Sequence, residues 1–160
     1  MIQIRSAVKE DCKNIIKLVQ ELADYQKLSD GPSLTPEKLE EDGFGSDPAF
    51  HCKVAYDGDK CVGYALYFYG FSTFYGRNAY MEDLYVSNNY RDKGIGSDLW
   101  RSAVKETLEK GCTTFDFSVL GDNLNAIEFY ERKGAKNKTE LENWHAFRLD
   151  KGGMEHFLHS

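Results

Sequence analysis

A polar loop at residues 91 to 97 has the residue types that bind a phosphate. Arg91 and Lys93 are basic, and Gly94 and Gly96 stand where a helix-like stretch begins. Backbone N–H groups at a helix start lack partners and point outward with the positive end of the helix dipole. Glycines let an anion approach that backbone without meeting a Cβ. The loop is therefore suited to a pyrophosphate, although an ordinary glycine-rich helix start has the same sequence features.

The glycine spacing argues against two common nucleotide-binding motifs. A dinucleotide-binding fingerprint has a third glycine where Leu99 stands, and the Gly-Lys-Ser or Gly-Lys-Thr run of a P-loop does not occur. Nicotinamide and nucleoside triphosphate ligands are thus disfavoured. The anion expected at this loop belongs to a different kind of ligand.

Two further side chains are candidates for proton transfer. Tyr130 lies in a helix-like stretch from Asn123 to Lys133, and a phenol with a pKa of about 10 keeps its proton near neutral pH. Glu82 lies in a strand-like stretch from Ala79 to Val86 and can accept a proton. From the residues alone, a structural role is more common than a catalytic one for both: Tyr130 as a residue of an amphipathic helix, and Glu82 as a solvated residue of a strand.

Length and composition describe one acidic domain. The chain has 160 residues and a mass of 18.3 kDa, which fits a single domain over residues 1–160. With 20 basic and 26 acidic residues the net charge is −6, which argues against nucleic-acid phosphates and favours a cationic partner. No apolar run is long enough for a membrane span, and the N-terminus lacks the apolar segment of a signal peptide. We therefore expect a cytoplasmic protein with no nucleic-acid or membrane partner.

The cysteines and histidines predict neither disulfides nor a metal site. Cys12, Cys52, Cys61 and Cys112 are far apart and form no Cys-x-x-Cys pair, so reduced thiols are expected. No pair of histidines has a ligand spacing with a third partner nearby, so no metal is expected.

Hydrophobic periodicity switches between that of strands and that of helices along the chain. The pattern predicts, in order, a strand at 2–4, a helix over 9–27, a turn over 29–32, a short helix over 36–42, strands over 51–56, 61–69 and 79–86, a helix over 94–110, a strand over 113–120, a helix over 123–133 and a strand over 144–149. Interleaved strands and helices of this kind predict an α+β fold with mixed strand pairing.

The two candidate stretches together resemble the GCN5-related N-acetyltransferase (GNAT) superfamily. Its members pair an Arg/Gln-x-x-Gly-x-Gly/Ala helix start with an Asn and a Phe-Tyr on the next helix, as Arg91 to Gly96 and Asn123 to Tyr130 do here. The chain is most similar to the diamine (spermidine/spermine) and thialysine acetyltransferase branch, through blocks at 21–25, 41–45, 51–52, 81–83, 91–97 and 129–135. The resemblance implies a central, mixed, mostly antiparallel twisted sheet of about six or seven strands flanked by about four helices, and a homodimer.

The resemblance also implies a reaction and its site. Acetyl-CoA is the expected cosubstrate, and its acetyl group would pass directly to the primary amine of a small molecule. The residues implied to bind this cosubstrate are Leu84, Tyr85, Val86, Arg91, Asp92, Lys93, Gly94, Ile95, Gly96, Ser97, Asn123, Asn125, Ala126 and Tyr130. A bulge near Leu84 is expected to splay two strands so that N–H groups face the thioester. Tyr130 would act as the general acid that protonates the departing CoA thiolate.

The amine must lose a proton before it can attack. A lysine-like ammonium with a pKa of about 10.4 is neutral in roughly one molecule per thousand near pH 7.4, so a base is needed. The resemblance implies Glu82 as that base, acting through water. The residues implied to bind the amine are Tyr25, Gln26, Glu82, Asp83, Glu142 and Trp144.

One block departs from the polyamine-acetylating relatives, which have an acid where Ser72 stands and a tryptophan where Phe74 stands. Loss of one carboxylate weakens the hold on a second ammonium, whereas Arg77 could tolerate a substrate carboxylate. A thialysine-like amino acid is therefore the first expectation and a polyamine the second, and an acid restored at residue 72 should favour spermidine. The alternatives are acetylation of a protein N-terminus or lysine, and a non-catalytic acyl-CoA-binding module.

Overall fold

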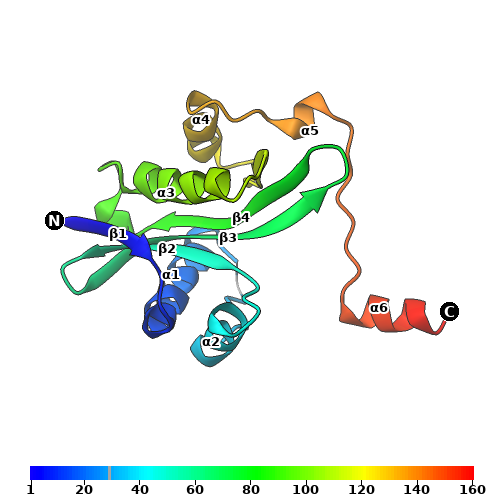
Figure 1. The fold of residues 1–160 in the computed structure, drawn as a ribbon, viewed down its shortest axis with the longest axis horizontal. Helices are drawn as coiled ribbons and strands as arrows, with labels where there is room; N and C mark the ends of the chain where they lie inside the picture. The colour runs from blue at the N-terminus through cyan, green and yellow to red at the C-terminus, as the bar shows by residue number, and fades with distance from the viewer. Residues whose placement is uncertain (29) are drawn as a thin grey trace. The chain divides into compact units, whose positions relative to one another are not determined.

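The computed structural model describes residues 1–28 and 30–160, in two parts, Met1–Ser118 and Val119–Ser160. The first part contains β1 (Ile2–Ser6), the 3-10 helix η1 (Lys9–Asp11), α1 (Cys12–Tyr25), α2 (Pro36–Phe44), β2 (His51–Asp57), β3 (Lys60–Ser72), β4 (Gly76–Val86), the 3-10 helix η2 (Asn88–Tyr90), α3 (Ile95–Glu109) and β5 (Thr114–Phe117). The second contains α4 (Leu124–Arg132), α5 (Lys138–Leu141) and α6 (Lys151–Leu158) (Figure 1). Ser29 of the predicted turn lies outside the described residues.

The strands of the first part form one mixed sheet in the order β1-β2-β3-β4-β5. Neighbouring strands pair antiparallel from β1 to β4, and β5 pairs parallel to β4. This arrangement confirms the predicted α+β fold with a mixed, mostly antiparallel sheet.

The sheet has fewer strands than the six or seven expected, because the described residues of 144–149 form no strand. The apolar side chains there are exposed, Trp144 by 77%, Phe147 by 95% and Leu149 by 60%. A strand needs a neighbouring strand to satisfy its backbone groups, and alternation of apolar residues does not supply one. The prediction of a final strand was therefore wrong.

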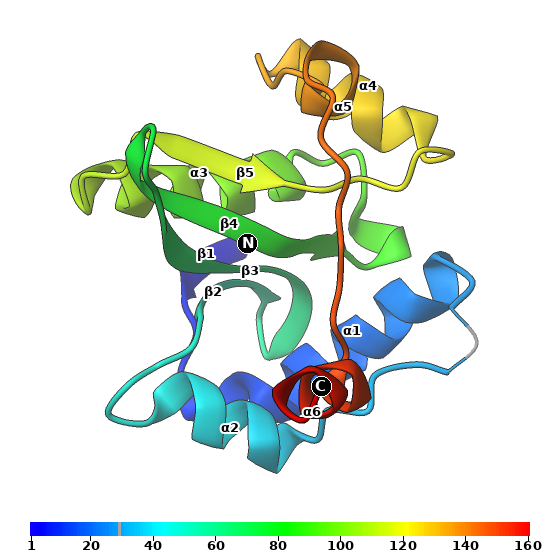
Figure 2. The ribbon, with the colours of Figure 1, turned by 90° about the vertical axis from the view of Figure 1, so that its right-hand side faces the viewer.

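Helices cover both faces of this sheet. Figures 1 and 2 show α1 and α2 on one face and α3 on the other. The amphipathic faces of α1 and α2 close a core over the sheet, and its buried members are Cys12, Ile15, Leu18, Leu39, Phe50, Cys52, Val54, Tyr64 and Tyr85. On the opposite face α3 buries Ile95, Leu99, Ala103 and Thr107. Within the described residues, no helix combines the length and apolar composition needed to cross a membrane.

A buried carboxylate links the start of α1 to the sheet. Asp11 is 3% exposed and accepts hydrogen bonds from Arg5 (2.6 and 2.9 Å), the Tyr56 hydroxyl (2.6 Å) and the Val8 N–H (2.8 Å). Burial works to raise the pKa of Asp11, but these hydrogen bonds outweigh it and the pKa is lowered. The ionised carboxylate is therefore the form that the fold stabilises.

Asp11→Ala is expected to reduce the free energy of unfolding by about 3 kcal/mol, because three donors lose their acceptor and Arg5 loses its counter-charge. Urea denaturation measures the loss. Asp24→Ala is the control, since Asp24 is an exposed acid of α1 whose carboxylate accepts a hydrogen bond from Gln20. With a lowered folded pKa, the contribution of Asp11 is present above the ordinary aspartate pKa and is lost as the pH falls through the lowered value. A difference between parent and variant that persisted unchanged in strong acid would contradict this account.

Candidate active site

Strand β4 carries a bulge beside an unpaired edge. Leu66 of β3 pairs with Asp83 and Tyr67 pairs with Met81, so Glu82 is an extra residue that bends the strand. The pairing with β5 ends at Met81, opposite Phe117. Among the described residues, no strand pairs with 82–86 on the β5 side. The pairing of β4 with β5 thus ends at the bulge, as the resemblance implies for two splayed strands. The bulge itself lies at Glu82, two residues before Leu84.

The backbone of this splayed segment presents N–H groups to the open edge. The Ser87 N–H donates to the Val62 carbonyl (2.8 Å) and therefore points toward β3. Successive N–H groups of a strand point to opposite edges, so that of Tyr85 also points toward β3, and those of Leu84 and Val86 point to the open edge. Two donors spaced in this way can bind the amide groups of an extended ligand or a carbonyl oxygen that gains charge.

The loop after β4 has the conformation expected of an anion site. Gly94 caps α3 in a left-handed conformation (φ 81°), and no side chain caps the helix start. Asp98 is the first residue of the helix whose N–H is bonded, to the Gly94 carbonyl (3.0 Å). The N–H groups of Ile95, Gly96 and Ser97 precede it and have no place in the helix ladder, because the first turn of any helix leaves them free. They are the donors that a pyrophosphate needs.

Arg91 fixes this loop to the neighbouring elements. Its Nε donates to the Val86 carbonyl (3.0 Å), and its guanidinium lies 4.3 Å from the ring centre of Tyr25 and 5.4 Å from that of Tyr85. Lys93 donates to the Asn89 carbonyl (3.0 Å). Arg91 thus holds the loop against β4 and α1 as well as contributing positive charge, whereas the hydrogen bond of Lys93 stays within the loop.

Helix α1 contacts the same strand end from the other side. The Glu21 carboxylate accepts from the Tyr85 hydroxyl (3.2 Å) and the Ser87 hydroxyl (2.8 Å). Burial and the Glu21 charge raise the pKa of Tyr85. Tyr25, predicted to border the amine pocket, lies at the last turn of α1, and Gln26 is its C-cap residue. Sequence reasoning did not single out the role of Glu21, although Glu21 belongs to one of the blocks shared with the relatives.

The two candidate carboxylates of β4 have different surroundings. Glu82 is exposed, whereas Asp83 is only partly exposed and accepts a hydrogen bond from the buried Tyr64 hydroxyl (2.9 Å). Burial raises the pKa of Asp83, and the nearby charge of Glu82 raises it further. Sequence reasoning missed Tyr64 because nothing in an apolar strand pattern marks a buried tyrosine as polar.

The second part of the chain holds the other predicted residues. Asn123 caps α4, its side chain accepting from the Ala126 N–H (3.2 Å), and Asn125 and Ala126 lie in the first turn. Tyr130 lies on the same helix, one position after Phe129, and burial raises the pKa of Tyr130 to about 12. The phenol is therefore fully protonated at neutral pH, as a general acid must be.

Glu142 and Trp144 are brought together by a hydrogen bond from the indole Nε1 to the carboxylate (2.8 Å). Lys138 also pairs with Glu142 (3.4 Å). The carboxylate is thus already bound to one cation of its own chain, which an amine substrate would have to displace or share.

Ser72 has a local role that the sequence did not reveal. Its hydroxyl accepts from the Phe74 N–H and the Tyr75 N–H, both at 3.2 Å, and so stabilises the turn between β3 and β4. Ser72 pairs with Gly76, five residues along β3 from the Tyr67 that flanks the bulge. At about 3.3 Å per residue, this is a separation of roughly 17 Å. Within the first part of the chain, Ser72 and Glu82 are therefore too far apart to bind one and the same ammonium.

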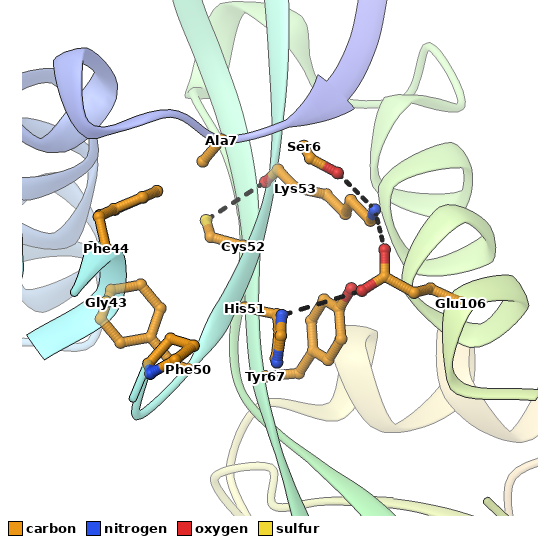
Figure 3. A pocket seen from close by; sticks show the side chains of 11 residues that line it. Ser6, Ala7, Gly43, Phe44, Phe50, His51, Cys52, Lys53, Tyr67 and Glu106 are labelled. Carbon is orange, nitrogen blue, oxygen red and sulfur yellow. Dashed lines mark hydrogen bonds and ion pairs between the residues drawn. The ribbon is translucent and has the colours of Figure 1, made fainter. Parts of the chain in front are cut away.

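A cavity of about 190 Å³ lies elsewhere in the first part and shares no residue with the predicted site (Figure 3). Lys53 donates to the Ser6 hydroxyl (2.8 Å) and pairs with Glu106. His51 Nδ1 lies 3.9 Å from Glu106, and burial lowers the pKa of His51. The charges of this cavity thus neutralise each other. No cluster of three or more metal-ligating side chains was found among the described residues.

Comparison with known proteins gives one consistent family. The model of the acetyltransferase (GNAT) family matches residues 15–135. A pig protein named thialysine N-epsilon-acetyltransferase is 43% identical over 96% of this chain and 95% of its own length. A human spermidine/spermine N(1)-acetyltransferase-like protein is 33% identical over 93% of this chain and 22% of its own length. An integron cassette protein from the V. cholerae mobile metagenome has the same fold, with a TM-score of 0.79, 23% identity and coverage of 99% and 98%.

Proposed function

This chain belongs to the GNAT family of acetyltransferases, and from that premise we propose that it transfers the acetyl group of acetyl-CoA directly to the primary amine of a thialysine-like amino acid. The observation that carries the proposal is the open edge of β4 followed by the uncapped start of α3. The open edge of β4 offers two N–H donors to an extended arm, and the start of α3 offers N–H donors to a pyrophosphate. Coenzyme A has both groups.

Each proposed residue has a defined task in the transfer. The N–H groups of Leu84 and Val86 hold the pantetheine arm and the thioester, with Tyr85 between them. The loop donors of Asp92, Gly94, Ile95, Gly96 and Ser97, with Arg91 and Lys93, hold the pyrophosphate, and Asn123, Asn125 and Ala126 form the cofactor contact of α4. The amine nitrogen attacks the carbonyl carbon, a C–N bond forms, and the C–S bond breaks.

Two side chains carry the protons of this reaction. Glu82 takes the first proton of the ammonium through water before attack, and the leaving thiolate receives the Tyr130 hydroxyl proton. The pKa of about 12 keeps that proton on Tyr130 until the thiolate develops. The second nitrogen proton is lost as the amide forms and returns through water to Tyr130, which restores its hydroxyl. No covalent enzyme intermediate is required, because the amine attacks directly.

The amine pocket is proposed to comprise Tyr25, Gln26, Glu82, Asp83, Glu142 and Trp144. Carboxylates and aromatic faces are the groups that bind an ammonium. The names of two relatives refer to amines of this kind: the pig protein is named a thialysine N-epsilon-acetyltransferase and the human one a spermidine/spermine N(1)-acetyltransferase-like protein. The greater identity to the first supports thialysine as the leading substrate and polyamines as the second.

Ser72→Asp is expected to raise kcat/KM for spermidine relative to thialysine by about tenfold, because the restored carboxylate can bind a second ammonium of a polyamine. At roughly 17 Å along β3 from the bulge, the new carboxylate is too far from Glu82 to share one ammonium with it, so its contribution requires a substrate with well-separated ammonium groups. Aspartate can also keep the turn, because its oxygen accepts the same N–H groups. Steady-state kinetics with both amines at low salt measure the ratio, with Ser72→Asn as the uncharged control. A ratio within about twofold of the parent value would contradict this selectivity role of residue 72.

A homodimer in the cytoplasm is part of the proposal. Support for the dimer comes from the apolar side chains left exposed after residue 140, namely Leu141, Trp144, Phe147, Leu149, Met154, Phe157 and Leu158. Exposed large apolar side chains in this number are typical of a chain with an interaction surface. Support for the compartment comes from four free cysteines, three of them buried. Light scattering of the purified protein tests the oligomeric state.

An assay of purified protein with acetyl-CoA against an amine panel tests the activity. Thialysine should be acetylated with the highest kcat/KM, followed by spermidine and spermine. Acetylation of a peptide N-terminus or peptide lysine in preference to every small amine would favour the protein-modifying alternative. Acetyl-CoA binding without transfer to any acceptor would favour the non-catalytic one.

A further inference from the structure

The buried Tyr64 of β3 and the partly exposed Asp83 of β4 form a hydrogen-bonded polar pair on the side of the sheet that α1 covers. Tyr64 is 0% exposed, and its hydroxyl donates to Asp83 Oδ2 at 2.9 Å. A buried hydroxyl without a partner is costly, and a buried carboxylate more so, which means that each group depends on the other. The hydrogen bond also fixes the orientation of the carboxylate relative to strand β3.

The bulge places this pair next to the proposed base. Glu82 and Asp83 are consecutive residues on the bulged strand, and both stand where β3 offers the single residue Leu66. A bulge of this type turns its consecutive side chains toward the same side of the sheet, instead of opposite sides as in a regular strand. The charge of Glu82 accordingly reaches Asp83 and acts to raise its pKa. An exposed and a partly buried carboxylate thus adjoin at one point.

The other elements packed around Asp83 bring few charged groups close to its carboxylate. From β3 the group that faces it is the Tyr64 hydroxyl, and from β2 it is the Cys52 thiol. On α1 the nearest acid described is Glu21, whose carboxylate is bonded by Tyr85 and Ser87 instead. Among the described residues, no cation is paired with Asp83. A cation arriving here meets two carboxylates and one oriented hydroxyl.

Building on the proposed function, we propose that Tyr64 is a positioning residue for the amine substrate: its hydroxyl holds the Asp83 carboxylate so that Asp83 and Glu82 together bind the ammonium. The bond from Tyr64 occupies Oδ2 and leaves Oδ1 for the substrate. Asp83 then binds the cation while the exposed Glu82 receives its proton through water. Amine binding, and not acetyl-CoA binding, depends on Tyr64.

The hydroxyl also sets the pH at which the pocket accepts a cation. Burial and Glu82 raise the pKa of Asp83, and the Tyr64 hydrogen bond lowers it. Removing the hydroxyl therefore raises the pKa, so a higher pH is needed to ionise Asp83. The acid limb of kcat/KM for the amine, which reports groups of the free enzyme, should move to higher pH.

The experiment compares Tyr64→Phe with Tyr67→Phe. Both tyrosines are 0% exposed and both lie on β3, but the Tyr67 hydroxyl lines the cavity near Glu106. Each change removes one oxygen from a buried ring of the same strand. Tyr64→Phe should raise the KM for thialysine about tenfold and shift the acid limb upward, with acetyl-CoA affinity within about twofold of the parent. Tyr67→Phe should leave the KM for thialysine and the acetyl-CoA affinity within about twofold of the parent values. It should also leave the acid limb at the pH of the parent.

The two variants separate this inference from the proposed function. Equal KM values and acid limbs for Tyr64→Phe and the parent would overturn the role of Tyr64 while leaving acetyl transfer intact. A parent that acetylates no amine would overturn the proposed function itself. If Tyr64→Phe does not fold, Asp83→Asn tests the inference in its place. Asp83→Asn should raise the KM for the amine at least tenfold and leave the acetyl-CoA affinity unchanged. An unchanged KM for the amine would overturn the inference.

Discussion

Tyr130→Phe is expected to lower kcat by about 10² to 10⁴-fold with little change in acetyl-CoA affinity, because it removes only the hydroxyl that we propose protonates the leaving thiolate. Burial raises the pKa of Tyr130 to about 12, so the parent enzyme should show no loss of kcat from this group across the neutral and mildly alkaline range. Steady-state kinetics at saturating acetyl-CoA and thialysine measure kcat, and isothermal titration calorimetry measures the acetyl-CoA affinity.

Tyr75→Phe is the control for this prediction. Tyr75 is 61% exposed in the turn between β3 and β4, and the change removes the same atom far from the proposed chemistry. It should leave kcat unchanged. Parent-like turnover by Tyr130→Phe would return Tyr130 to an ordinary residue of α4 and require another proton donor.

Gly96→Val is expected to weaken acetyl-CoA binding by at least about 100-fold and to abolish thermal stabilisation by the ligand. At 100 times the dissociation constant a ligand stabilises the native state by about 2.7 kcal/mol, which corresponds to roughly 5 to 10 °C in Tm for a chain of this size. A Cβ at Gly96 would meet only Val86 Cγ2 at 3.7 Å, an ordinary contact, so the fold accepts it. The added methyl groups would instead occupy the space in front of the loop donors.

Gly152→Val is the matched control, because Gly152 is the second residue of α6 as Gly96 is the second residue of α3. Both changes place a β-branched side chain in the first turn of a helix, and only the first should abolish the ligand response in thermal denaturation. Gly94 is unsuitable for this test. Its φ of 81° strains any other residue whatever the ligand does, although sequence reasoning alone treats the two glycines alike.

The elements with strong local signals were predictable from the sequence. The short helix expected from residue 36 begins there as α2, where Thr35 accepts from the Lys38 N–H (3.1 Å) and a proline stands in the first turn. The helix expected from residue 123 likewise begins there, with Asn123 as the cap of α4. Such signals act within a few residues, so they need no knowledge of the rest of the fold. The helix expected over 9–27 differs only in beginning with a 3-10 turn and ending at Tyr25.

The parts of the site that depend on distant pairing were not predictable from local patterns. The exact position of the bulge follows from the register of β3 against β4, which no residue type in either strand specifies. The role of Ser72 in a turn and the buried pair of Tyr64 with Asp83 follow from the same register. Resemblance to relatives supplied Glu82 and Asp83, but only the strand pairing shows that one is an extra residue and the other is held by a neighbour.

The burial of the cysteines has a practical consequence for measuring this enzyme. The reaction releases a free CoA thiol, and chromogenic disulfide reagents detect that thiol only as its thiolate. Cys12, Cys52 and Cys112 are buried, and burial raises the pKa of Cys12, Cys52 and the half-buried Cys61. Three of the protein's four thiols are therefore inaccessible while the chain is folded, and the raised pKa of the half-buried Cys61 keeps its thiolate scarce. Product formation can be followed continuously with such a reagent, and a rising baseline before the amine is added reports unfolding of the enzyme.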